Sequence, residues 1–214
     1  MKLRIASLSL LALCLAVVPA IAQQQEIYSN GPINGTTDAW TINSGFVVSD
    51  SFFVGSSAIL ENGLQFGAWL FPGDVLQSAE VSISSAEFGG TTYTDQIVNF
   101  TETGCSGNQY GFSVCTETGS FGTALNLAYG TYWLNLQNAV VNTGDPIYWD
   151  ENSGPSSAAQ NSVGTIPSES FARLGVNCSS TNGNPPPSVP EPSVMLLFGS
   201  GILGLAGILR RKLF

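Results

Sequence analysis

The sequence predicts an all-β protein whose central part folds as an antiparallel β-sandwich. Three observations predict this fold class. Short stretches alternate apolar with polar residues, no stretch in the middle of the chain keeps helical periodicity over three turns, and Asn-Gly or Pro-Gly pairs separate the stretches. Alternation with a period of two is typical of strands that bury one face, and such pairs favour tight turns. Many short strands joined by glycine-rich turns favour a sandwich.

The clearest predicted strand spans 64–70, where apolar residues occupy every even position. Trp69 has the opposite phase and is therefore expected to face outward. Tyr132 and Trp133 are neighbours in another predicted strand, so they face opposite ways and one of them is expected in the core. The other predicted strands span 46–54, 79–83, 96–102, 110–117, 125–127, 132–136, 147–149 and 170–174.

The stretch LAYGTYWLNL at 127–136 resembles the Gly-Thr-Tyr strand start that is common in exported jelly-roll domains. The resemblance implies that the sandwich is of the jelly-roll kind. We expect this domain to span 23–178, a length that suits one domain and that can bury about 70% of the surface of its unfolded chain.

The N-terminal 22 residues have the three parts of a secretory signal peptide. Lys2 and Arg4 provide a charged start, 5–18 is almost continuously apolar, and Ala20 and Ala22 are small residues where signal peptidase would cleave. A lipoprotein signal that ends at Cys14 is the alternative. The bulky residue before that cysteine and the apolar run after it argue against this alternative.

The C-terminal segment 194–209 carries no charge and predicts a transmembrane helix. Its length corresponds to a helix of about 24 Å, which is short for a hydrocarbon core of about 30 Å. Arg210, Arg211 and Lys212 follow directly and are expected to stay in the cytoplasm. The segment is therefore expected to be a marginal, temporary anchor.

Pro190, Glu191 and Pro192 precede this helix. Their order, followed by a short apolar helix and a basic cluster at 210–212, resembles the PEP-CTERM sorting signal of Gram-negative bacteria that make extracellular polysaccharide. The resemblance covers 190–214. It implies recognition by an exosortase, a membrane cysteine protease, with cleavage near the motif and transfer of the outer part to the cell envelope or extracellular matrix.

A linker is expected at 179–189, where three consecutive prolines make the chain stiff and solvated. Between the signal peptide and the sorting motif the chain has 14 acidic residues and one basic residue, Arg173. Such a charge balance repels nucleic acid, so no nucleic-acid partner is expected.

The cysteine pattern agrees with export. Removal of the signal peptide takes Cys14 and leaves Cys105, Cys115 and Cys178. We expect a disulfide between Cys105 and Cys115, which would stabilise the fold by about 2 to 3 kcal/mol. Cys178 is expected to be a free thiol beside the linker, although it is also an alternative partner for either of the other two.

The sequence contains no histidine, which excludes Ser-His-Asp and Cys-His hydrolases and His-ligated zinc. No phosphate-binding glycine loop is recognisable. We therefore expect no enzymatic activity. No cofactor is expected either, apart from the calcium ion considered next.

One cluster combines an aromatic ring with carboxylate and amide groups, as a sugar site requires. It lies in the stretch GDPIYWDENSG and consists of Asp145, Trp149, Asp150, Glu151 and Asn152. The same oxygens could instead hold calcium. The structural alternative is that Trp149 or its neighbour Tyr148 points into the core while the polar residues form a solvated turn.

These features predict an exported, non-enzymatic β-sandwich with a structural or adhesive role in the envelope or matrix. The alternative is a carbohydrate-binding module for matrix polysaccharide that acts through the loop at 145–152 and an exposed tryptophan. Expected partners are signal peptidase and an exosortase during processing, the membrane through the C-terminal helix, and extracellular polysaccharide.

Overall fold

The computed structural model describes residues 25–55 and 59–177. The expected signal peptide, the linker, Cys178, the Pro-Glu-Pro motif, the transmembrane helix and the basic cluster all lie outside the described residues. Within the described ranges, none of the secondary structure is a helix that is long and apolar enough to cross a membrane.

The described residues form twelve strands that pair in antiparallel fashion. The prediction of an all-β antiparallel fold is therefore confirmed. In chain order the strands are β1 (Gln25–Ser29), β2 (Ala39–Thr41), β3 (Val47–Val54), β4 (Ile59–Leu70), β5 (Leu76–Ala86), β6 (Gly89–Gly107), β7 (Ser113–Asn126), β8 (Gly130–Val141), β9 (Tyr148–Asp150), β10 (Ala158–Gln160), β11 (Gly164–Ile166) and β12 (Phe171–Asn177).

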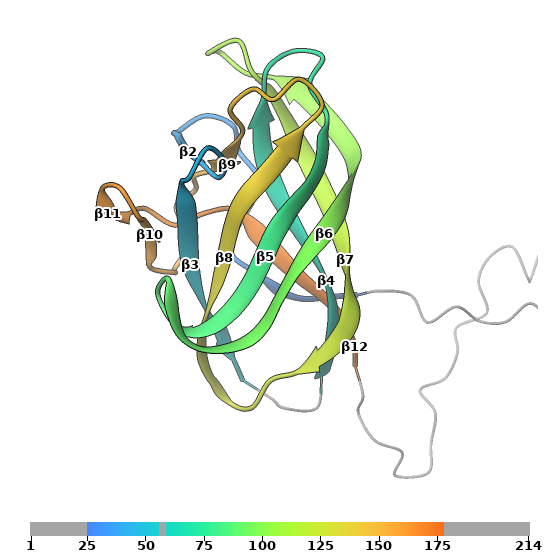
Figure 1. Ribbon diagram of the computed structural model, residues 1–214, viewed down its shortest axis with the longest axis vertical. Helices are drawn as coiled ribbons and strands as arrows, with labels where there is room; N and C mark the ends of the chain where they lie inside the picture. Colours follow the sequence, from blue (N-terminus) through green and yellow to red (C-terminus); the bar gives the residue numbers. More distant parts are fainter. Residues whose placement is uncertain (1–24, 56–58, 178–214) are drawn as a thin grey trace, which may run out of the picture. The chain divides into compact units, whose positions relative to one another are not determined.

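The strands form one sheet that curls back on itself into two facing layers (Figure 1). One layer has the order β1-β12-β4-β7, and the other has the order β6-β5-β8-β3 with β10 and β11 beyond. The long strand β6 joins them, because its first half pairs with β5 and its second half pairs with β7. Strands that follow one another in the chain mostly change layer, as in a jelly roll.

The core lies between the two layers and follows the period-two pattern. The even positions of β4, Leu64 to Leu70, are all fully buried. From the facing layer, Phe52, Leu134 and Leu136 are buried as well. Tyr132 is buried whereas its neighbour Trp133 is half-buried, so the prediction that one of the two faces the core is confirmed.

The predicted strands all overlap observed ones, with two notable differences at their ends. The predicted strand at 110–117 begins only at Ser113, because Asn108 Oδ1 accepts the N–H groups of Tyr110 and Phe112 and closes a turn there. The predicted strand at 125–127 is the end of the longer β7. The short strands β1, β2, β10 and β11 were not predicted.

A disulfide joins Cys105 of β6 to Cys115 of β7, which lie directly opposite each other. This confirms the predicted pairing. The bridge closes a loop with a sequence separation of 10 at the end of β6 that pairs with β7.

Arg173 of β12 is the single basic residue among the described residues, and it is buried. Its guanidinium makes a two-pronged contact with the buried carboxylate of Glu61 on β4 and lies 4.0 Å from the centre of the Phe52 ring. Burial lowers the pKa of Arg173 to about 9. The described surface therefore exposes acidic groups and no basic side chain.

Candidate functional site

The predicted sugar or calcium cluster at 145–152 does not form one exposed site. Asp145 is exposed, whereas Trp149, Asp150, Glu151 and Asn152 are all buried. The cluster divides because β9 pairs with β2 on one side and with β4 on the other. Both edges of β9 are therefore paired with neighbouring strands.

Trp149 is a core residue with no exposed surface. Its indole N–H donates to the carbonyl oxygen of Ser170 at 2.8 Å, and its ring packs against Phe66 and Phe171. Because its ring is enclosed in the core, Trp149 offers no face on which a sugar could stack. Of the two sequence interpretations of this tryptophan, the structural one holds.

Asp150 acts as a buried acceptor for three donors that come from distant parts of the chain. Its Oδ2 accepts the backbone N–H of Asn34 at 2.9 Å. Its Oδ1 accepts the N–H of Gly35 at 2.9 Å and the indole N–H of Trp69 at 2.7 Å. Hydrogen bonds to a carboxylate are stronger than neutral ones. Asp150 therefore fixes both the loop before β2 and the Trp69 side chain.

Glu151 and Asn152 also make internal bonds. Glu151 Oε2 accepts the indole N–H of Trp40 at 2.9 Å. Asn152 Nδ2 donates to the carbonyl oxygen of Asn30 at 2.8 Å, and its Oδ1 accepts the N–H of Gly154. These oxygens do not converge on one point with those of Asp145.

A calcium site at 145–152 therefore finds no support in the geometry. Within the described ranges, one group of three metal-ligating side chains has its ligand atoms close together, namely Glu102, Cys105 and Cys115. Both sulfur atoms of this group are held in the disulfide, so they are not free to bind a metal.

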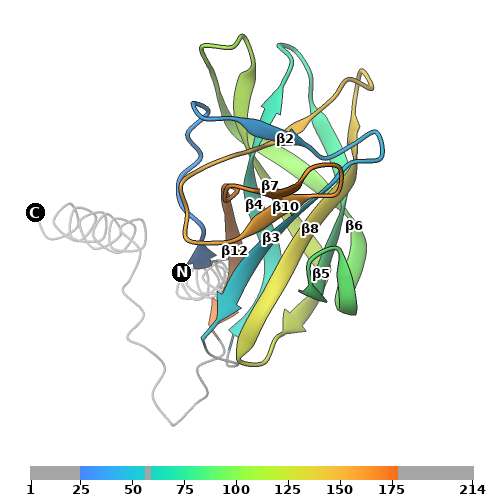
Figure 2. The same ribbon diagram turned by 90° about the vertical axis from the view of Figure 1, so that its left-hand side faces the viewer.

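An open groove of about 350 Å³ lies beside Asp150 and is lined by aromatic rings. A neighbouring hollow of about 180 Å³ shares three of its lining residues. We call these two hollows together the aromatic groove; it is lined by Thr37, Asp38, Ala39, Trp69, Tyr110, Phe112 and Tyr148. Ala39, which lines the groove, is the first residue of β2, and Figure 2 shows β2 crossing the longer strands in the upper part of the view.

The rings of the groove are arranged by three elements. Trp69 at the end of β4 lies opposite Tyr148 at the start of β9. The Tyr110 ring stacks on Trp69 with centroids 5.6 Å apart, and the Phe112 ring lies edge-on to Tyr148 at 5.5 Å. The Tyr110 hydroxyl also donates to the carbonyl oxygen of Thr36 at 3.3 Å. The turn before β7 is thereby joined to the loop before β2.

Trp69 is only 4% exposed, so the outward direction that its phase predicts does not make its ring accessible to solvent. The phase of the alternation was right, because Trp69 points away from the core face of β4. Tyr110 and Phe112 cover its ring, and Tyr110 itself is 54% exposed. Sequence reasoning missed Tyr110 and Asp38 as site residues, although two aromatic residues in a turn between paired cysteines were a usable signal.

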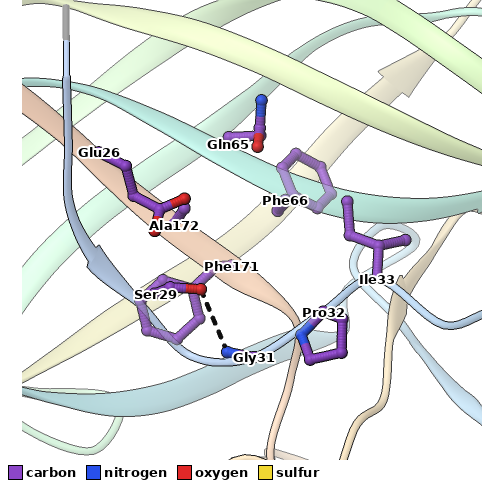
Figure 3. Close-up of a pocket in the computed structure, with 9 residues that line it drawn as sticks. All are labelled: Glu26, Ser29, Gly31, Pro32, Ile33, Gln65, Phe66, Phe171 and Ala172. Atoms are coloured by element: carbon purple, nitrogen blue, oxygen red, sulfur yellow. Dashed lines mark hydrogen bonds between the residues drawn. The ribbon is translucent and has the colours of Figure 1, made fainter.

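A second pocket of about 180 Å³ lies between β1, β4 and β12. Figure 3 shows Glu26 and Gln65 on one side of it and Pro32 and Ile33 on the other. Its two phenylalanines, Phe66 and Phe171, are core residues at most 2% exposed, so they offer no aromatic face. The remaining residues that line it are Ser29, Gly31 and Ala172. This pocket is therefore less suited to a ligand than the aromatic groove.

A buried polar cluster is formed by Asn30, Asp50, Ser156 and Ser168, and it too was not predicted from the sequence. Asn30 Nδ2 lies within hydrogen-bonding distance of Asp50 Oδ2 at 3.0 Å, Ser156 Oγ at 2.6 Å and Ser168 Oγ at 2.8 Å. Asp50 Oδ2 also accepts the backbone N–H of Glu169 at 2.7 Å. Burial raises the pKa of Asp50 to about 7, although its hydrogen bonds partly oppose this shift.

The fold and the groove define an antiparallel jelly-roll-like domain with an aromatic surface site. Comparison with known families adds the class of protein: residues 188–212 match the PEP-CTERM protein-sorting motif. The chain is therefore an exported protein that passes through the membrane and is directed to an exosortase. No curated protein matches the chain.

Proposed function

We propose that this protein is a non-enzymatic structural or adhesive component of the envelope or extracellular matrix of a Gram-negative bacterium, where it holds polysaccharide in the aromatic groove. The sorting motif supports delivery to the cell exterior. The acidic residues at 150 and 151 support a non-enzymatic role, because they are buried and accept internal hydrogen bonds.

The observation that carries carbohydrate binding is the exposed Tyr110 ring, stacked on Trp69 at the edge of an open groove. A sugar ring presents C–H groups on its faces and hydroxyl groups at its rim. Aromatic faces pack against the former, while carboxylate and carbonyl oxygens accept hydrogen bonds from the latter. Asp38 is exposed and lines the groove, so it supplies such an acceptor.

The charge of the domain favours a neutral polysaccharide. The described surface exposes no basic side chain, because Arg173 is buried against Glu61. An anionic chain would meet Asp38 in the groove and further acidic groups around it, so like-charge repulsion would weaken its binding. We therefore expect uncharged glucans or mannans to bind better than uronic-acid polymers.

Affinity electrophoresis of the full chain through gels that contain neutral or acidic polysaccharides tests this proposal. We expect a neutral polymer to retard the wild type and Tyr110→Ala to weaken binding about tenfold, which corresponds to about 1.4 kcal/mol. Tyr129→Ala is the matched control, because Tyr129 is 73% exposed and lines neither hollow of the groove.

Two results would count against the proposal. If no polysaccharide retards the wild type, carbohydrate binding fails, and the structural role then rests on the sorting motif alone. If a polysaccharide binds but Tyr110→Ala and Tyr129→Ala bind equally well, the groove is not the site.

A further inference from the structure

Two glutamates face each other inside the sandwich, at the end that holds the buried polar cluster. Glu151, directly after β9, forms an antiparallel bridge with Glu169, two residues before the start of β12. The flanking bonds run from Asn152 N–H to the Ser168 oxygen at 2.7 Å and from Ser170 N–H to the Asp150 oxygen at 2.8 Å. This pattern defines a non-hydrogen-bonded pair, in which the two side chains lie on one face and approach most closely.

The carboxylate of Glu169 has no partner of its own. Glu169 has no exposed surface, and neither of its carboxylate oxygens has a hydrogen-bond partner. Glu151 has the indole N–H of Trp40 as a donor. A third buried carboxylate, Asp50, reaches the pair from β3 in the opposite layer, and its Oδ1 is also without a partner.

No positive charge balances these groups within the part of the chain that the structure describes. Arg173 is engaged with Glu61, and its guanidinium lies over the rings of Tyr28 and Phe52. The other charged groups that act on Glu169 are Asp38, from the loop before β2, and Asp150 of β9, and both are acidic. Three buried carboxylates cannot all be ionised under such conditions, because each charge costs several kcal/mol to desolvate and repels the others.

We propose that Glu151, Glu169 and Asp50 form a proton-dependent latch that holds the start of β12 to the end of β9 and to β3. While the latch is protonated, the two glutamates lie side by side as neutral carboxyl groups. As the protons leave for the solvent, the carboxylates repel each other across the bridge. The loop that carries Asp38 is tied to the same place, because Glu151 N–H donates to the Asp38 carbonyl oxygen at 3.0 Å.

The direction of the pH dependence follows from burial. Burial and the neighbouring carboxylates raise the pKa of Glu169 well above its usual value, and burial raises that of Glu151 and brings that of Asp50 to about 7. A carboxyl group whose pKa is raised by folding stabilises the folded state fully below its unfolded pKa of about 4. That stabilisation is lost as the pH rises through 7 and beyond.

Thermal unfolding of the full chain between pH 5 and pH 8 tests the latch. We expect the Tm of the wild type to fall by at least about 4 °C over this range. Glu169→Gln keeps the shape of the neutral side chain, so it should reduce the fall and melt above the wild type at pH 8. A smaller fall should remain, because burial also raises the pKa of Asp50, and of Glu117 on β7 outside the latch, to about 7. Glu87→Gln is the matched control: Glu87 is exposed, and this variant should retain the wild-type slope.

The latch is wrong if Glu169→Gln keeps the pH dependence of the wild type. It is also wrong if calcium chloride raises the Tm of the wild type at pH 8 and EGTA reverses this, because a cation then neutralises the carboxylates. If Glu169→Gln does not fold, infrared spectra of the wild type at pH 7 decide: a band from protonated carboxyl groups is required, and its absence refutes the latch.

Opening of the latch would also move the loop that carries Asp38 and so weaken glycan binding; this consequence rests on the proposed function. Amide hydrogen exchange separates the two ideas. Faster exchange of the segments 150–153 and 168–171 at pH 8 than at pH 5, after correction for the intrinsic rates, supports the latch whether or not a polysaccharide binds. Equal protection of these segments at both pH values contradicts it.

Discussion

Replacing Asp150 with asparagine should destabilise the fold strongly, although the side chain keeps its size. The carboxylate accepts three hydrogen bonds, of which two end on Oδ1 and one ends on Oδ2. An asparagine oxygen can replace Oδ1 for Gly35 and Trp69. Its amide group then faces the N–H of Asn34 at a distance of about 2.9 Å, so two donors meet.

The magnitude follows from these contacts. One backbone N–H loses its acceptor in a partly buried place, which costs about 1 to 3 kcal/mol. The other two bonds lose the help of the negative charge and weaken by about half. We therefore expect Asp150→Asn to lower the free energy of unfolding by about 2 to 4 kcal/mol. With an m-value of about 2 kcal/mol per M, the urea midpoint falls by about 1 to 2 M.

Urea unfolding followed by tryptophan fluorescence measures this difference. Asp145→Asn is the matched control, because it makes the same chemical change five residues earlier, in the loop before β9, where the side chain is exposed. The control should stay within about 0.5 kcal/mol of the wild type. Equal midpoints for the two variants would refute the role assigned to Asp150.

Two further substitutions test the packing of β4. Arg173→Met should lower the free energy of unfolding by about 3 to 5 kcal/mol, because it leaves Glu61 buried and unpaired. The double variant with Glu61→Leu should recover most of this loss. A single variant that is as stable as the wild type in chemical unfolding would contradict the ion pair. Gly67→Ala places a Cβ 2.6 Å from Ser170 Oγ and should lower the free energy of unfolding by about 1 to 3 kcal/mol. Gly104→Ala is the control, because its Cβ meets no atom within 4 Å. A smaller midpoint shift for Gly67→Ala than for Gly104→Ala would contradict the close approach.

Period-two alternation was sufficient to locate the main strands, because burial of one strand face leaves that signature in the sequence. It could not tell which outer faces are covered. Trp69 has the predicted phase but is buried, since Tyr110 and Phe112 fold over it from a turn more than forty positions later in the chain. Such cover depends on tertiary contacts that no local pattern records.

The polar loop at 145–152 was misinterpreted for a related reason. Carboxylates and amides in a loop predict solvent exposure when their partners are unknown. Asp150 finds its backbone partners at sequence separations of 115 and 116, so the sequence nearby cannot reveal them. The sequence did contain one signal for the buried polar cluster. Asp50 has the same phase in β3 as Val48 and Phe52, which are core residues, so its side chain points into the protein.

Asp150 and the aromatic groove are linked through Trp69 and the loop before β2, so two kinds of variant can be distinguished. Asp150 holds the loop before β2 and Trp69 from below, while Tyr110 closes over Trp69 from the solvent side. Loss of Asp150 must therefore weaken folding and glycan binding together. Loss of Tyr110, which is half exposed, removes a binding face while leaving the hydrogen bonds of Asp150 in place. A variant that loses binding but keeps its urea midpoint consequently identifies a residue that contacts the glycan.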